Sequence, residues 1–201
     1  MGNPVLPLLD ELRLIAQNGL EYADNPYDEE RYERILDLVS EHYAELGDLQ
    51  PSEVGDRFSE RVGHVTPNVG GRAAIVNDRG QLLLMKRAGD NTWGLPGGFS
   101  APGETPAETA VREAKEETGL EVDPVELVEF RYRDPDGHNP HGFVGAVYLC
   151  RVIGGSLAGS HESDELRYRD IEAVDEWYKD NYRAAQNAIT RWKEESNTGQ
   201  R

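Results

Sequence analysis

GFSAPGETPAETAVREAKEETGL, residues 98–120, contains signals for both the beginning and the end of one helix. Its TPAE segment, residues 105–108, has the pattern of a capping box with proline at the first helical position, so a helix is predicted to begin there. Gly119 suits the left-handed conformation that ends many helices. The rest of the interpretation follows from the helix predicted between these two points.

Three carboxylates crowd one face of that helix, because Glu113, Glu116 and Glu117 follow one another at i, i+3 and i+4. In an exposed helix their repulsion would cost about 0.2–0.5 kcal/mol per pair. A divalent cation would reverse this cost, since hard ions such as Mg²⁺ take carboxylate oxygens and bridge substrate phosphates. Arg112 lies beside Glu113 and four residues before Glu116, where it could orient a glutamate. The pattern favours a metal site, and a charged surface helix is the alternative.

A resemblance to a known family rests on these same residues. Gly98, Glu104 and the run from Arg112 to Leu120 match the Nudix box at every defined position, without insertion. MKRAGDNTWGLPGGF, residues 85–99, also resembles the strand and turn that precede the box in such enzymes. The chain therefore resembles the Nudix hydrolases, which implies an α/β (α+β) sandwich with a mixed sheet between helices.

The resemblance also implies roles for the residues of the box. The implied ligands of a Mg²⁺ or Mn²⁺ cofactor are Glu113, Glu116, Glu117 and the carbonyl of Gly98. Glu104 and Arg112 would be structural, tying the loop to the helix and steering the glutamates, and Glu116 and Glu117 would also be catalytic. A Nudix-fold module that senses a nucleotide without cleaving it is the alternative from another class. Such modules usually lose box carboxylates, whereas this chain keeps all of them.

Hydrolysis also needs a base to deprotonate the attacking water. In related enzymes this base is often a box glutamate or a glutamate of a late loop. Glu162, within GSHESDELRYRD at residues 159–170, matches the place of that late glutamate and is the predicted metal ligand or base. Glu165 is the second candidate, and solvated loop acids are the simpler interpretation of both. His161 could also serve, although a lone loop histidine is more often merely exposed.

Substrate contacts are predicted from a loop and from one strand end. RYRDPDGHNPHGF, residues 131–143, is rich in Gly, Pro and Asn, as loops between strands are. This loop could bring four side chains to a diphosphate or sugar: Arg131, Arg133, His138 and His141. Ordinary loop polarity is the alternative for all four. Arg87 is the better phosphate candidate, because it ends a strand just before the box loop.

The chain is expected to divide into a helical domain at residues 1–48, a linker at 49–66, a Nudix hydrolase domain at 67–195 and a frayed tail at 196–201. IAQNGLEYADNPYDEERYERILDLV, residues 15–39, is similar to the helical extension of Nudix hydrolases that cleave X-linked nucleoside diphosphates. Two short helices cannot bury their own apolar stripes, so packing and homodimerisation are the expected role of this domain.

The strands are expected on either side of the box. VGGRAAIVNDRGQLLLMKR, residues 69–87, has two apolar runs broken at residues 77–80, the pattern of a β-hairpin. Residues 121–134 and 143–155 have the composition of further strands. A helix over residues 171–196 is expected to close the domain.

Composition restricts the partners and the environment. The net charge of −17 argues against a nucleic-acid partner, which normally meets a basic face. The basic residues are 17 Arg against 4 Lys, and an acidic, lysine-poor surface is typical of proteins from salt-rich cytosols, so a halophilic source is expected. No apolar run approaches the ~20 residues of a membrane span, which predicts a cytoplasmic protein with no membrane partner. The single cysteine, Cys150, is expected to pack inside its strand.

The predicted activity is metal-dependent hydrolysis of the pyrophosphate bond in a nucleoside diphosphate linked to another moiety, releasing a nucleoside monophosphate. Substrates like ADP-ribose or a CDP-alcohol are implied by the resemblance of the helical extension. A house-cleaning nucleoside triphosphate pyrophosphohydrolase is the second candidate within the enzymes. Those proteins are commonly shorter and lack such an extension, so hydrolysis of a linked nucleoside diphosphate is the preferred prediction.

Overall fold

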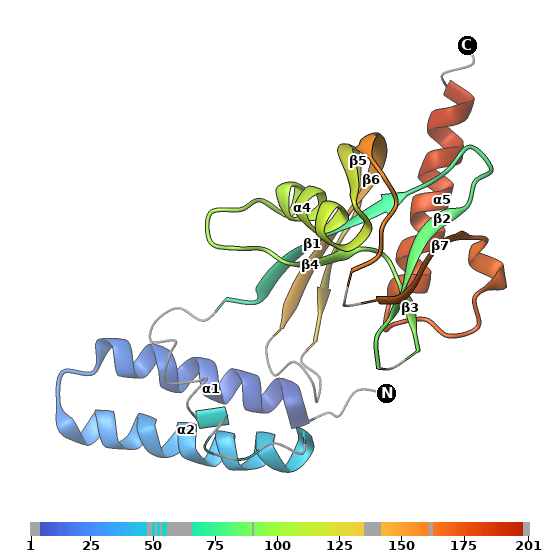
Figure 1. The fold of residues 1–201 in the computed structure, drawn as a ribbon. Helices are drawn as coiled ribbons and strands as arrows, with labels where there is room; N and C mark the ends of the chain where they lie inside the picture. Colours follow the sequence, from blue (N-terminus) through green and yellow to red (C-terminus); the bar gives the residue numbers. More distant parts are fainter. Residues whose placement is uncertain are drawn as a thin grey trace. The chain divides into compact units, whose positions relative to one another are not determined.

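The computed structural model divides the chain into two compact units. The first comprises Met1–Asn68 with Tyr132–Phe143, and the second comprises Val69–Arg131 with Val144–Arg201 (Figure 1). The structure describes residues 5–47, 50, 52, 54–55, 66–89, 91–134, 142–160 and 163–198. No helix in this described part of the chain combines the length and the apolarity that crossing a bilayer requires.

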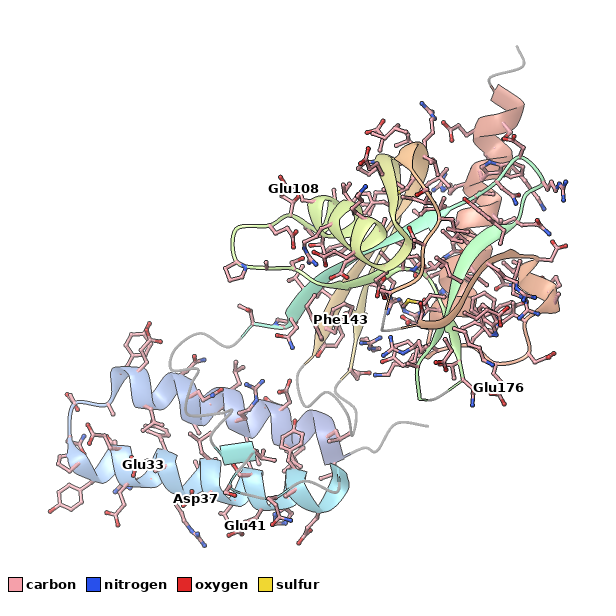
Figure 2. All side chains as sticks on the ribbon, in the orientation of Figure 1. Glu33, Asp37, Glu41, Glu108, Phe143 and Glu176 are labelled. Carbon is pink, nitrogen blue, oxygen red and sulfur yellow. The ribbon has the colours of Figure 1, made fainter. Side chains whose placement is uncertain are left out.

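The first unit contains two long helices that pack side by side, α1 (Val5–Tyr22) and α2 (Pro26–Gly47) (Figure 1). Asn25 precedes α2, where its Oδ1 accepts a hydrogen bond from the Asp28 N–H at 3.0 Å. The side chains buried between the helices and the short segment that follows them are Leu6, Leu9, Val39, Tyr43, Ala44 and Val54. Glu33, Asp37 and Glu41 follow one another along the outer face of α2, all exposed (Figure 2). The helical extension expected at this end of the chain is therefore present.

The remaining elements are mostly strands, with helices between and after them. They are β1 (Asn68–Ile75), β2 (Leu82–Arg87), β3 (Trp93–Gly94), β4 (Gly97–Phe99), α4 (Pro106–Thr118), β5 (Leu120–Arg133), β6 (Phe143–Gly155), β7 (Ser163–Arg169), the 3-10 helix η1 (Ile171–Ala173) and α5 (Asn181–Thr198). The described strands form a four-stranded sheet in the order β4-β1-β6-β5 and a three-stranded sheet in the order β3-β2-β7.

Both sheets lie between α4 and α5 in the second unit (Figure 1). Successive residues of a strand point to opposite faces, so β1 and β2 contribute to two cores. The core beneath α4 includes Ala73, Ile75, Leu83, Ala110 and Ala114. The core beneath α5 includes Ala74, Leu82, Leu84, Ala184 and Ala188. The predicted α/β sandwich with a preceding helical region is confirmed.

The β-hairpin predicted over residues 69–87 is wrong in its pairing. The turn itself forms, with the Gly80 N–H donating to the Asn77 oxygen at 2.9 Å. After a single bridge between Val76 and Leu82, however, the two strands separate into different sheets. β1 pairs with β4, and β2 pairs with β3 and β7. Both apolar runs are buried on both faces, so each strand needs its own neighbours as well as helices above and below.

Cys150 lies within β6 and is 4% exposed, as expected for a residue packed inside its strand. Burial, with a smaller effect of the Asp123 carboxylate, raises the pKa of its thiol to about 12. The thiol therefore stays protonated at neutral pH.

Candidate active site

Helix α4 begins and ends at the residues expected from the sequence. The Thr105 Oγ1 accepts from the Glu108 N–H at 3.3 Å, and the Glu108 Oε2 accepts from the Thr105 N–H at 2.8 Å, which completes the capping box. Glu108 marks this end of the helix in Figure 2. Gly119 has φ 72° and its N–H donates to the Lys115 oxygen at 3.0 Å. Both predicted helix caps are confirmed.

The start of α4 rests directly on the backbone of β1. A Cβ atom on Gly71 would lie 1.9 Å from the Pro106 carbonyl oxygen, which no side chain could tolerate. Along one edge of β1, Gly71 pairs with Gly98 and Arg72 pairs with Gly97 of β4. The helix and β4 are therefore both fixed against the same short piece of strand.

Glu117 is the most buried of the three box glutamates, at 5% exposure. Its Oε2 accepts a hydrogen bond of 2.7 Å from the Gly97 N–H of β4. A Cβ on Gly97 would lie 2.4 Å from the Gly71 oxygen, so only glycine lets this amide come so close to β1. The carboxylate of Glu117 is thereby held at the beginning of the box loop.

Glu113 lies against Gly98, the predicted carbonyl ligand. A Cβ on Gly98 would lie only 2.3 Å from the Glu113 Oε1, so the absence of a side chain there makes room for the carboxylate. The Glu113 side chain is 13% exposed, whereas that of Glu116 is 60% exposed. The exposure of the three carboxylates of α4 thus increases from Glu117 through Glu113 to Glu116.

Arg112 connects the loop to the acidic face of α4. Its Nε donates to the Glu104 Oε1 at 2.8 Å, and its Nη2 donates to the other oxygen of that carboxylate at 3.0 Å. Its Nη1 donates to the Glu113 Oε1 at 2.8 Å and to the Glu116 Oε2 at 3.0 Å. The Nη2 also reaches the Phe99 carbonyl at 3.0 Å. One guanidinium therefore touches three of the carboxylates singled out from the sequence.

These contacts shift the pKa values of the ion pair. The hydrogen bonds from Arg112, followed by one from the Ala101 N–H at 2.9 Å, lower the pKa of Glu104 to about 2. Glu104, with smaller contributions from Glu113 and Glu116, raises the pKa of Arg112. Both groups are therefore charged at neutral pH.

The lowered pKa of Glu104 makes its contribution to stability depend on pH. A carboxyl whose pKa is lower in the folded state than its ordinary 4.5 stabilises the fold above that pH and stops doing so as the pH falls toward about 2. We expect the difference in free energy of unfolding between the wild type and Glu104→Gln to be constant above about pH 5 and to shrink between pH 4.5 and 2. Urea unfolding over a pH series measures it. A difference that stays the same down to pH 2, or that varies just as strongly when Arg112 is alanine in both proteins, would contradict Arg112 as the main origin.

The residues of this face suit a hard cation, although they do not enclose one. Within the described ranges, no group of three or more His, Cys, Asp or Glu side chains is gathered closely enough to hold a metal ion. Glu113 and Glu116 nevertheless already meet at a single cationic nitrogen, the Nη1 of Arg112. Carboxylate oxygens are the ligands that Mg²⁺ and Mn²⁺ prefer. The donor set therefore fits the predicted cofactor.

The remaining predicted residues lie outside this network or outside the described residues. Glu162, His138, His141 and His161 fall in the parts of the chain that the structure does not describe. Glu165, the second candidate base, is on β7 and forms an ion pair with Arg167.

The three arginines predicted to contact substrate each have a different partner. The Arg87 guanidinium lies over the ring of Tyr178, 4.2 Å from its centroid. The Arg131 Nη1 is 3.9 Å from the Asp180 Oδ2. In the first unit, the Arg133 guanidinium lies over the Phe143 ring at 4.8 Å. Arg87 and Arg131 are thus both held by the short segment that precedes α5.

The predicted start of the C-terminal helix is wrong. The helix begins at Asn181, whereas Ile171 begins only the short 3-10 helix η1. After η1 the chain runs beside β3, where the Trp93 N–H donates to the Glu176 oxygen at 2.9 Å and the Tyr178 N–H donates to the Trp93 oxygen at 2.8 Å. Because these backbone groups serve β3, they are not available to a helix. The Asp-Asn pair at 180–181 was the available signal, since both residue types favour helix starts.

Comparisons with known proteins agree with the geometry of α4 and its loop. The model of the NUDIX domain matches residues 67–192, and a model described as a UDP-X-like, N-terminal oligomerisation domain matches residues 3–58. The protein YjhB of Bacillus subtilis (strain 168) is 34% identical over 132 residues, which cover 66% of this chain and 63% of that protein.

Two further relatives extend this similarity. An ADP-ribose pyrophosphatase of Methanocaldococcus jannaschii is 34% identical over 123 residues, covering 59% of this chain and 71% of that one. The crystal structure of a UDP-X diphosphatase superposes with a TM-score of 0.55 at 25% identity, covering 92% of this chain and 93% of that one. The similarity to this structure thus takes in the helical region as well as the sheets.

Proposed function

The chain belongs to the NUDIX domain family, and from this premise we propose that it hydrolyses the pyrophosphate bond of a nucleoside diphosphate linked to another moiety, with a divalent metal as cofactor. The observation that carries the proposal is the acidic face of α4, complete in all its carboxylates and organised by Arg112. The relatives named for ADP-ribose and UDP-X hydrolysis support this substrate class. A CDP-alcohol belongs to the same class.

The metal site is proposed from Glu113, Glu116 and Glu117 with the carbonyl of Gly98. A bound Mg²⁺ or Mn²⁺ would neutralise charge on the diphosphate and lower the pKa of coordinated water. Gly97 holds the Glu117 carboxylate from the loop side, and Arg112 holds the other two glutamates from the helix side. The chain thus restrains its acidic side chains before any ligand arrives, which reduces the entropy cost of binding.

We assign deprotonation of the attacking water to Glu162, with Glu116 or Glu117 as the alternative bases and Glu165 as a weaker candidate. A carboxylate takes this role by accepting the proton of a water molecule within hydrogen-bond distance. Glu165 is less suitable because its carboxylate is already engaged by Arg167.

Arg87 is the leading candidate for contact with the diphosphate, with Arg131, Arg133 and His138 as further ones. The planar guanidinium fork of arginine matches two phosphate oxygens at once. The Tyr178 ring beneath Arg87 restrains its long side chain while leaving its charge intact.

A substrate panel tests the activity. The protein would be incubated with ADP-ribose, CDP-choline, a UDP-sugar and the nucleoside triphosphates, each with Mg²⁺, with Mn²⁺ and with EDTA. We expect metal-dependent release of a nucleoside monophosphate from one of the first three. Pyrophosphate released mainly from the triphosphates would favour the house-cleaning activity instead. Tight binding with no cleavage of any compound would favour a nucleotide-sensing module.

We further propose that two copies associate through α1. Its exposed apolar residues recur at intervals of three and seven along the helix: Val5, Leu8, Ile15 and Tyr22. Their exposures range from 41% to 70%. Exposed apolar side chains that recur along one helix indicate a surface that binds another protein. The match of residues 3–58 to an oligomerisation domain supports a second copy as the partner.

Charged substitutions on this face test the dimer. Leu8→Glu combined with Ile15→Glu places charges where apolar contacts are proposed, so we expect the molar mass by light scattering to fall from that of a dimer to that of a monomer. Glu33→Gln combined with Glu41→Gln, on the acidic face of α2, is the matched control and should remain a dimer. A monomeric wild type, or a dimeric Leu8/Ile15 variant, would contradict the assignment.

A further inference from the structure

Asn181 uses both ends of its side-chain amide although it lies far from the box in sequence. The residue is 1% exposed. Its Oδ1 accepts from the Leu95 N–H at 2.9 Å, and its Nδ2 donates to the Tyr178 oxygen at 2.7 Å. A Cβ on Gly94 would lie 3.4 Å from the Asn181 Oδ1, so the strand before the box packs closely on this amide. Only a side chain with one acceptor and one donor satisfies both contacts.

A short, buried path leads from this amide to the catalytic face. Leu95, which Asn181 holds, is 4% exposed and is followed by Pro96, whose oxygen accepts from the Ala73 N–H of β1 at 2.9 Å. The next residue, Gly97, donates its N–H to the Glu117 Oε2. Pro96 is thus the only residue between Leu95, whose N–H binds Asn181, and Gly97, whose N–H binds Glu117. A shift at Leu95 would reach the Gly97 N–H through Pro96, whose carbonyl belongs to the same peptide unit as that N–H.

Asn181 is itself held by the segment that runs beside β3. Lys179 has φ 48°, a left-handed conformation that is rare for a residue other than glycine and costs free energy. This turn brings the Tyr178 oxygen to the Asn181 N–H at 3.0 Å as well as to its Nδ2. The amide thus sits in a fixed place at the start of α5, anchored on both sides.

We infer that Asn181 is a positioning residue for Glu117: through Leu95 and Gly97 it sets the direction of the N–H that orients this carboxylate toward the cation. The inference rests on the proposed function, because it concerns a carboxylate proposed to bind the metal. Hydrogen-bonded groups behind a metal ligand typically change metal affinity or activity by about 10–100-fold when they are removed.

Asn181→Asp and Asn181→Ala test this role. Aspartate keeps an acceptor for the Leu95 N–H but turns a second oxygen toward the Tyr178 carbonyl, and alanine removes both contacts. We expect kcat to fall about 10–100-fold with KM nearly unchanged, and Mn²⁺ binding without substrate, measured by electron paramagnetic resonance, to weaken about tenfold. Hydrogen exchange of a peptide covering residues 93–99 should become faster. If both variants fail to fold, Asn181→Ser, which keeps a residue suited to a helix start, takes their place.

Asn187 offers a matched control on the same helix. Its Nδ2 donates to the Glu129 Oε2 at 2.6 Å, so Asn187→Asp loses a side-chain hydrogen bond and adds like-charge repulsion with Glu129, a residue outside the box loop. The Asn181 variants should differ from it in kcat, Mn²⁺ affinity and exchange at residues 93–99. If they match Asn187→Asp in all three while Glu117→Gln abolishes turnover, the role of Asn181 is overturned and the proposed function stands. If Glu116→Gln and Glu117→Gln both leave turnover and Mn²⁺ binding normal, the metal site of the proposed function itself fails.

Discussion

Glu117→Gln is expected to lower kcat by about 10²–10⁴-fold while leaving the free energy of unfolding nearly unchanged. Glutamine retains an oxygen that can accept the hydrogen bond from the Gly97 N–H, so the contact between helix and loop survives. What disappears is the negative charge proposed to bind the cation. Glu116→Gln, on the exposed side of the same face, should give a loss of similar size. Steady-state kinetics on the substrate found with the panel, together with urea unfolding, measures both effects.

Glu121→Gln is the control for a change of charge close to α4. Glu121 forms an exposed ion pair with Lys115 at 2.7 Å, on residues that the proposed chemistry does not use. Solvent screens exposed pairs and leaves them little net effect, so this variant should keep normal turnover and stability. If Glu116→Gln and Glu117→Gln both behave like Glu121→Gln, the acidic face of α4 is not the metal site.

Arg112→Ala should reduce activity by about 10–100-fold and weaken Mn²⁺ binding. Without the guanidinium, Glu113 and Glu116 lose their shared partner and repel each other, and the Phe99 carbonyl and Glu104 lose the contact that ties the loop to the helix. Arg112→Lys should restore little, because an ammonium group cannot reproduce the fork that holds Glu104 through two nitrogens.

Arg191→Ala controls for the removal of an arginine with several acidic partners. Arg191 lies on α5, 3.3 Å from Glu194 and 3.7 Å from Glu126, and neither of these partners belongs to the box. We expect its loss to leave kcat and Mn²⁺ affinity unchanged. Equal kinetics for the Arg112 and Arg191 variants would mean that the network around Arg112 serves stability alone.

The box helix could be predicted almost completely from the sequence, because its signals are local. The capping box at Thr105, the left-handed Gly119 and the common face of the glutamates all depend on residues within one or two helical turns of each other. The contact of Arg112 with Glu116 likewise follows from their spacing of four.

The pairing of the strands could not be predicted in the same way. A turn at Asn77–Gly80 is a local event, whereas the partners of β1 and β2 are strands elsewhere in the chain. Register and neighbours depend on which strand buries both faces of each apolar run, and the residues of the turn carry no information on that choice. The prediction of a hairpin was therefore right about the turn and about both strands, and wrong about the pairing of the two strands with each other.

Asn181 was missed for a related reason. It is 86 residues from Leu95, and its importance comes from a buried amide that meets two backbone groups, which leaves no periodic pattern in the sequence. The segment that precedes Asn181 was predicted to be helical. Its backbone hydrogen bonds to Trp93 instead favour an extended path.

The burial of Cys150 also makes spectroscopic labelling practical. A protonated thiol inside β6 reacts slowly with maleimides and iodoacetamides, since these reagents attack the thiolate. A cysteine introduced on the surface of each unit could then carry a fluorophore with little background from the native residue. Distances between such probes, with and without nucleotide, would report how the helical unit and the unit bearing α4 are arranged in solution.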